Sequence, residues 1–171
     1  MKKFLQFAGL ISAVLAIAAF IFMMAGKALV YETSSATYFV SGTRAIFGGK
    51  EETILGTAEY KPAATALIAW ILILAAVVIL VAGVILPLLK VTALEKVAGL
   101  LNLIAVCALV VGGILLFFTQ PVFNTANKTS LGTLYDDYKL SVAFVFAAIL
   151  SIAGGVIAIL PAAMDFIGKK K

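Results

Sequence analysis

The side chains that most often carry chemistry inside membranes are nearly absent from this sequence. It has no histidine and one cysteine, Cys107, and no charged residue lies in the central part of its four long apolar segments. Proton and ion relays use ionisable side chains within the membrane, and the small four-helix multidrug exporters carry such a Glu. Disulfide-forming membrane enzymes need paired cysteines, and intramembrane serine proteases pair Ser with His. We therefore expect no enzymatic activity, no cofactor and no metal site.

The composition places the chain in a membrane. Of its 171 residues, 64% are hydrophobic and 12% are charged, and the mean hydropathy is +1.18. A soluble domain averages about 45–50% apolar and about 25% charged residues, so a soluble chain of this length could not keep its apolar surface from water. Disorder is excluded because apolar residues dominate. The sequence therefore predicts an all-α integral membrane protein with one domain, residues 1–171.

Four uncharged segments reach the length of about 20 residues that a helix needs to cross a bilayer. A cleaved signal peptide is the alternative for the first segment, but its apolar run is longer than is usual for one. The pattern predicts a bundle of four transmembrane helices at 4–26, 63–89, 97–119 and 140–164, with outer loops at 27–62 and 120–139, an inner loop at 90–96 and an inner tail at 165–171.

The basic residues indicate which way the helices cross. With both termini inside, the short inner segments hold seven Lys and two acidic residues, whereas the longer outer loops hold six basic and six acidic residues. The denser positive charge predicts cytoplasmic termini in the plasma membrane. The net charge of +5 then belongs to the inner face, so we expect no nucleic-acid partner. Weak contact with anionic lipid is expected from Lys169, Lys170 and Lys171.

The first outer loop is too long to be only a connector. It holds β-prone runs at 36–40, 43–47 and 51–55, and the pair Gly48-Gly49 lies between the second and third runs. A Gly-Gly pair between β-prone runs is typical of a hairpin. We therefore expect a small antiparallel β-sheet or hairpin packed on the outer ends of the helices.

The second outer loop carries Pro121, Asn124 and Asn127, which are turn-forming residues and predict an irregular segment. The run Asn127-Lys128-Thr129 also fits the acceptor pattern for N-glycosylation, which is frequent by chance. Both interpretations place these residues on the outer side of the membrane.

Two parts of the chain resemble each other outside the helices. Leu-Gly-Thr followed by an acidic residue, Tyr and Lys occurs at 55–61, before the second predicted helix, and at 131–139, before the fourth. The match predicts a tandem duplication with units 1–90 and 91–171, related by an axis along the membrane normal. The alternative is the general likeness of apolar helices and their flanks.

Small residues lie at helical spacing on one face of the fourth predicted helix, and a similar set lies on the third. Small side chains let helices approach closely, and a Ser among them can donate an interhelical hydrogen bond. We expect packing inside the bundle, with a homodimer seam as the alternative, and Asn102 is a further candidate for an interhelical hydrogen bond. The packing residues are Ala143, Ala147, Ser151 and Gly155 on the fourth helix and Ala105, Ala108 and Gly112 on the third.

Aromatic residues at the outer helix ends are typical of the interfacial belt of membrane proteins. We expect Tyr60, Tyr138 and Trp70 to be interfacial anchors, and Phe123 is interpreted in the same way. A binding surface is the alternative role for the two tyrosines. Cys107 is expected to be a small buried residue.

The layout resembles that of claudin-like tetraspan proteins, which have four helices, both ends inside and a long first outer loop with β-structure. The resemblance is limited to layout, because the first outer loop here lacks the Trp residues and the Cys pair of that family's signature. It therefore implies no function and no site residues.

The sequence is best interpreted as a non-enzymatic membrane protein that acts through protein–protein contacts, as a structural, scaffold or accessory subunit. Neutral outer loops rich in Tyr and Phe suit contact with a protein partner or with further copies of the chain. The alternative is a small oligomeric channel or transporter subunit, which ranks second because apolar helices offer few polar groups to line a pore.

Overall fold

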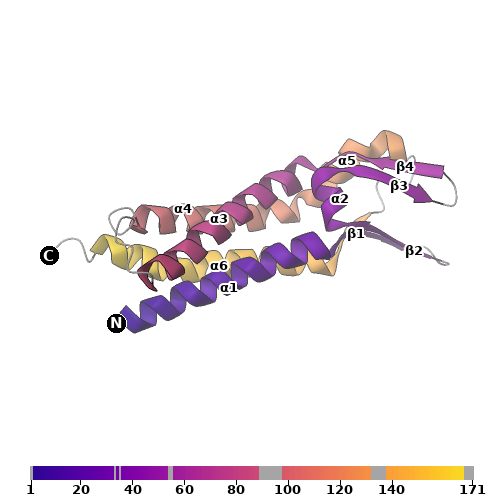
Figure 1. Cartoon of the computed structure of the whole chain (residues 1–171). Helices are drawn as coiled ribbons and strands as arrows, with labels where there is room; N and C mark the ends of the chain where they lie inside the picture. The colour runs from indigo at the N-terminus through magenta and orange to yellow at the C-terminus, as the bar shows by residue number, and fades with distance from the viewer. Residues whose placement is uncertain are drawn as a thin grey trace.

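The computed structural model of the chain describes residues 2–32, 34, 36–53, 56–88, 98–131 and 138–167. Four long helices run side by side, and the strands gather at one end of this bundle, which we call the sheet end (Figure 1). Helices α1 and α4 each pack against both α3 and α6, so the four helices form a ring. The four helices are α1 (Lys2–Ala25), α3 (Ala64–Leu88), α4 (Ala98–Phe117) and α6 (Val142–Ile167).

Each of these helices is long and apolar enough to cross a membrane. At a rise of about 1.5 Å per residue, even the 20 residues of α4 extend for about 30 Å, the thickness of the hydrocarbon layer. The bounds agree with the four predicted segments to within a few residues. The predicted framework of four apolar helices is therefore confirmed, and α1 begins at the end opposite the sheet end (Figure 1).

Two antiparallel sheets lie at the sheet end. One has the strand order β2-β1-β5, and the other pairs β3 with β4. Strand β5 lies between α5 and α6, so the first sheet joins the two halves of the chain. The strands are β1 (Lys27–Glu32), β2 (Thr37–Ser41), β3 (Gly49–Thr53), β4 (Gly56–Tyr60) and β5 (Lys139–Leu140).

Antiparallel pairing is present, but the hairpin predicted at Gly48-Gly49 is wrong. The run 43–47 belongs to a short helix, α2 (Gly42–Phe47), whose N-cap Ser41 Oγ accepts the Arg44 N–H at 3.3 Å. Gly48 ends α2 with a φ of 73°, a conformation that favours glycine, and the chain then continues directly into β3. The two hairpins are β1–β2 and β3–β4 instead.

The irregular structure predicted for 120–139 is wrong for the first part of that segment, because Thr119–Leu131 forms helix α5. Pro121 is tolerated near the start of α5, since an N–H there would have no partner within the helix. The Phe118 N–H donates to Leu115 O at 3.1 Å, and the Val122 N–H donates to Phe118 O at 3.4 Å. Helices α4 and α5 therefore follow each other through one tight turn.

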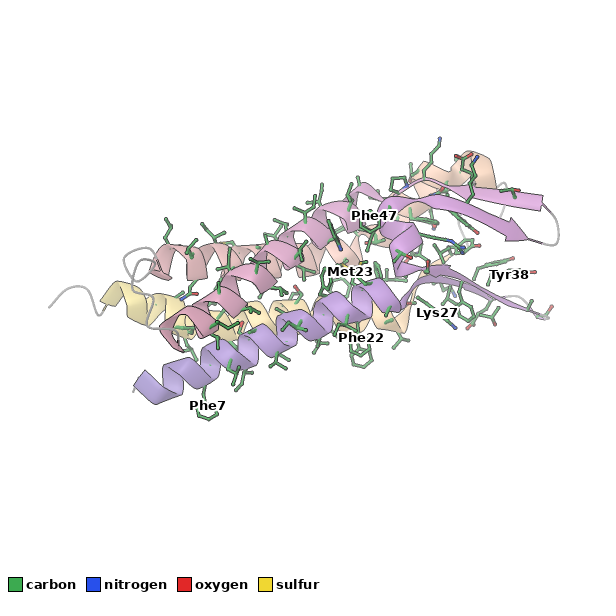
Figure 2. All side chains as sticks on the ribbon, viewed as in Figure 1. Phe7, Phe22, Met23, Lys27, Tyr38 and Phe47 are labelled. Atoms are coloured by element: carbon green, nitrogen blue, oxygen red, sulfur yellow. The ribbon has the colours of Figure 1, made fainter. Side chains whose placement is uncertain are left out.

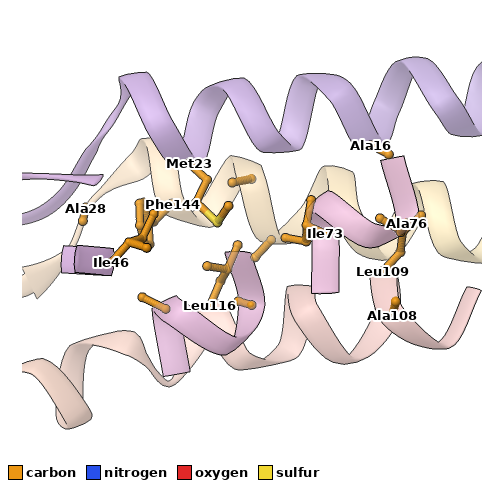
Figure 3. Close-up of a cluster of buried hydrophobic side chains, with 14 of the residues drawn as sticks. Ala16, Met23, Ala28, Ile46, Ile73, Ala76, Ala108, Leu109, Leu116 and Phe144 are labelled. Carbon is orange, nitrogen blue, oxygen red and sulfur yellow. The ribbon is translucent and has the colours of Figure 1, made fainter. Parts of the chain in front are cut away.

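Helix α2 covers the sheet end of the bundle. The Gly42 N–H donates to Gly26 O at 2.8 Å, and a Cβ at position 42 would lie only 1.8 Å from the Met23 carbonyl oxygen. Ile46 is fully buried and belongs to the same apolar cluster as Met23 and Phe144 (Figure 3). Burial of this face explains why 43–47 is helical despite its β-prone residues, because packing outweighs intrinsic strand preference.

Two serines join helices inside the bundle. Ser151 Oγ in α6 donates to Leu109 O in α4 at 2.7 Å, and Ser12 Oγ in α1 donates to Gly154 O in α6 at 2.6 Å. Both serines are fully buried. Each hydroxyl thus donates to a backbone carbonyl of a neighbouring helix. These hydrogen bonds offset the free-energy cost of burying a polar group in an apolar interior.

The small residues of α4 and α6 lie where helices touch. A Cβ on Gly155 would lie 2.8 Å from Val110 Cγ2, and a Cβ on Gly112 would lie 3.0 Å from Ile73 Cγ1 in α3. These positions are covered by other helices of the same chain and leave no open seam for a second copy on that face. The related alanines are Ala105, Ala108 and Ala147, which are buried, and Ala143, which is half-buried.

The tandem duplication of 1–90 and 91–171 stays a prediction. Its described parts, Tyr60-Lys61 and Tyr138-Lys139, occupy comparable places just before α3 and α6. The Gly-Thr pair at 132–133, the inner loop at 90–96 and the terminal Lys169–Lys171 lie outside the described residues.

Replacing Gly155 by Leu is expected to destabilise the bundle by about 2 kcal/mol or more, because the added side chain would overlap Val110 and the Val106 backbone. The measurement is thermal unfolding in detergent, followed by circular dichroism. Gly9→Leu is the matched control, since no atom lies within 4 Å of a Cβ at Gly9. Equal melting temperatures for the two variants would contradict the assigned packing.

Candidate functional site

The sheet end is held to the bundle by Asn127 of α5. The Lys61 N–H donates to Asn127 Oδ1 at 2.6 Å, and Asn127 Nδ2 donates to Lys61 O at 3.0 Å and to Phe123 O at 2.9 Å. The side chain is fully buried. The Asn127 side chain thus pairs with the N–H and the C=O of Lys61, as a neighbouring β-strand would. Lys61 is the first residue after β4, in the segment that leads to α3. Both amide hydrogens and the carbonyl oxygen of Asn127 are hydrogen-bonded.

Asn124, one turn earlier, makes the corresponding contact with the second half of the chain. Its Nδ2 donates to Tyr138 O at 3.2 Å, just before β5. Between the two asparagine contacts lies the fully buried Phe123, with its ring centroid 6.0 Å from that of Tyr60 and 6.4 Å from that of Tyr138. Helix α5 therefore connects the segments that enter α3 and α6.

This arrangement corrects two interpretations of the sequence. Glycosylation of Asn127 does not fit the fold, because the amide nitrogen that would carry the sugar is buried and donates to two carbonyl groups. Tyr60 and Tyr138 are 8% and 6% exposed, so their rings pack inside the protein, as does Phe123, and are not presented to a lipid headgroup layer. The regular spacing of Phe123, Asn124 and Asn127 is a helical pattern that could have indicated this inward face.

A second aromatic group lies on the three-stranded sheet. The Tyr31 ring in β1 is 6.0 Å from that of Tyr38 in β2 and 5.5 Å from that of Tyr138, which precedes β5. On the opposite face, Lys27 Nζ lies 3.2 Å from the centroid of the Phe39 ring, a cation–π contact. Tyr38 is 52% exposed and Phe39 is 40% exposed, so β2 presents an aromatic ring on each face.

The surface beside these rings has mixed charge. An open groove of about 510 Å³ lies between residues 30–32 of β1 and residues 139–142. Glu32 and Lys139 bring opposite charges to its walls, and both residues are exposed. In the sequence, Tyr31, Tyr38 and Phe39 are part of outer loops rich in Tyr and Phe, and only the alternation of side chains along the β-prone run distinguishes the last two from the others.

Trp70 lies half-buried in α3 near the sheet end. Its ring contacts Phe47 of α2 edge-on, with centroids 5.1 Å apart, and lies 6.4 Å from Phe20 of α1. Phe22 and Phe47 are exposed on the outside of the bundle in this region (Figure 2). Phe22, Phe47, Phe118 and Phe146 supply exposed rings around this end, the kind of side chain expected where a membrane meets water.

Cys107 and Asn102 are the two other residues of α4 for which the sequence suggested a role. Cys107 is exposed on the surface of α4, so the expectation that it is buried is wrong. Asn102 of α4 lies near Gly83 of α3, with its Oδ1 3.8 Å from where a Cβ of that glycine would be.

A comparison with models of known protein families finds no match, and neither does a comparison with curated proteins. The geometry of the sheet end and of the bundle is therefore the basis on which a function is proposed below.

Replacing Asn127 by Ala is expected to lower the free energy of unfolding by about 1–3 kcal/mol, because the partly buried N–H and C=O of Lys61 lose their partner. Thermal unfolding in detergent measures the change. Thr125→Ala is the control on the exposed side of α5, where the hydroxyl only donates to Pro121 O. If the Asn127 and Thr125 variants have the same melting temperature, Asn127 does not hold the sheet end in place.

Proposed function

We propose that this chain is a non-enzymatic plasma-membrane protein with both termini in the cytoplasm, which acts through protein–protein contacts made by its outer loops. In this proposal the sheet end is the outer surface, and the chain serves as a structural, scaffold or accessory subunit. The observation that carries the proposal is an aromatic strand edge, β2, presented on a sheet that is tied firmly to the bundle.

The sheet has little freedom to move relative to the helices. Ser141, at the start of α6, donates through Oγ to Lys27 O and through its N–H to Ala28 O. Strand β1 is therefore joined to α6 at its base, and it follows α1 after one residue, Gly26. A surface that is ordered before binding loses less conformational entropy on association, which favours a contact role.

The interior of the bundle supports this proposal over a pore through a single chain. The buried side chains described along its length are mainly Ala, Leu, Ile and Phe, and the hydroxyls of Ser12 and Ser151 donate to backbone carbonyls. Ile46 of α2 lies over one end. A water-filled path would need polar groups along the wall.

An oligomeric channel, the second hypothesis, would need such groups on the outside of the bundle. The exposed large residues of α1 are instead apolar along the helix, which suits contact with lipid tails. No observation on the described surface favours the channel. These α1 residues are Phe7, Leu10, Ile11, Val14, Ile17, Ile21 and Phe22.

A photo-crosslinking amino acid at Tyr38 or Phe39 is expected to form protein adducts in native membranes, because both side chains are exposed on β2. The measurement is a mobility shift on denaturing gels, with the partner identified by mass spectrometry. The same probe at Ile68, an exposed residue of α3, is the control and is expected to give no discrete protein adduct. Adducts at Ile68 alone would overturn the proposal.

Vesicles that contain the purified protein are expected to release trapped ions or small solutes no faster than empty vesicles, since the bundle interior is apolar. Ion flux is measured with a trapped cation-sensitive dye, with gramicidin as the positive control, and solute release is measured with a small trapped fluorophore, with melittin as the positive control. Efflux that rises in proportion to the protein content would favour the channel hypothesis.

A further inference from the structure

Among the residues that the structure describes, strand β2 is an edge of its sheet, because the strand order is β2-β1-β5. Natural edge strands are usually protected from pairing by charged residues, by Pro or by bulges. The sequence of β2, Thr-Tyr-Phe-Val-Ser, contains no charged residue and no Pro, and its first three residues are exposed. The irregularity of this hairpin lies on β1, between Lys27 and Leu29, and not on β2. This edge is therefore suited to accept another strand.

The direction of β2 limits what that strand can be. The β1–β2 hairpin continues away from the bundle along the general direction of the helices, so β2 runs back toward the bundle from the tip of the hairpin (Figure 1). A strand added in antiparallel fashion must then run away from this bundle. If it is the β2 strand of a second copy, the two bundles lie end to end with their sheet ends facing.

The side chains fit this self-pairing. Antiparallel pairing centred on Phe39 would place Phe39 opposite the same residue of the other copy and Thr37 opposite Ser41. In β1, Glu32 is the cross-strand partner of Thr37 and Lys27 is that of Ser41. The two outermost rows across the four strands would then each have Glu32 at one end and Lys27 at the other, whereas parallel pairing would place like charges at the two ends of each of these rows.

The overall charge is also compatible with two sheet ends that face each other. The segments 27–62 and 120–139 hold six basic and six acidic residues, so two copies approach without net repulsion. One pairing of five residues is small, but many copies between two membranes act together, which raises the effective affinity.

The geometry points to a homophilic contact between membranes, in which β2 pairs antiparallel with β2 of a second copy in an opposing bilayer. This inference rests on the proposed function and names the partner. The spacing of the membranes follows from the hairpin: six residues of β1 at about 3.3 Å each predict a gap of about 20 Å.

The test uses the full-length protein in two populations of phosphatidylcholine vesicles that carry donor and acceptor fluorophores. Mixed vesicles are expected to cluster, as measured by light scattering and energy transfer. Phe39→Lys in both populations, or Phe39→Glu in both, should lower the initial clustering rate about tenfold, because like charges would face each other at the centre of the pairing. Mixing Phe39→Lys vesicles with Phe39→Glu vesicles should restore clustering.

The control is Thr57→Lys, which adds the same charge to an exposed position of the other hairpin and should leave the rate unchanged. A misfolded variant would not be rescued by its oppositely charged counterpart, so rescue separates lost pairing from lost structure. Electron cryomicroscopy of the clusters should show bilayers about 20 Å apart.

Parent vesicles that do not cluster, or a mixture that is not restored, would overturn the homophilic contact. Protein adducts at Tyr38 and Phe39 in native membranes would in that case still support a contact with a different protein. An absence of adducts at both positions would refute the proposed function itself, so the two failures are distinguishable.

Discussion

The hydrogen bonds between Asn127 and the backbone of Lys61 determine how the rest of the molecule is arranged. Where a chain leaves a strand and enters an apolar helix, its peptide groups have no regular partner, and burial without one is costly. Asn127 supplies both a donor and an acceptor to Lys61, in the segment before α3. Asn124 supplies a donor to Tyr138, in the segment before α6. Because both asparagines belong to α5, one short helix sets the positions at which α3 and α6 begin.

This connection also explains how the three-stranded sheet comes to contain strands from both halves of the chain. Phe123 lies between Tyr60 and Tyr138, and Tyr31 continues the aromatic contacts from Tyr138 to β2. The exposed ring of Tyr38 is thus the last member of a series that starts in a buried core. A surface supported in this way keeps its shape in the absence of a partner, which is the property that a contact role requires.

The sequence allowed the four helices to be predicted because bilayer thickness imposes a length and a composition that few other structures share. Local preferences for strands and turns, in contrast, predicted the wrong structure at 43–47 and at 120–131. In the first segment burial of Ile46 outweighed strand preference, and in the second the asparagines that suggested turns bind distant backbone groups instead. Contacts such as that between Asn127 and Lys61, 66 residues apart, leave no local trace in the sequence. The edge of β2 was also hidden, because exposure depends on strand order.

The single residue between α1 and β1 has a mechanical consequence. The Gly26 carbonyl oxygen accepts the Gly42 N–H, and the Gly26 N–H donates to Phe22 O. There is no space for a side chain at Gly26, because Ala143 lies beside it. Because β1 follows α1 at this joint and is also hydrogen-bonded to α6 through Ser141, the hairpin turns together with the bundle as one body. Helices tilt in response to bilayer thickness, so a thicker or thinner membrane would swing the hairpin toward or away from the bilayer normal and change how far its tip extends.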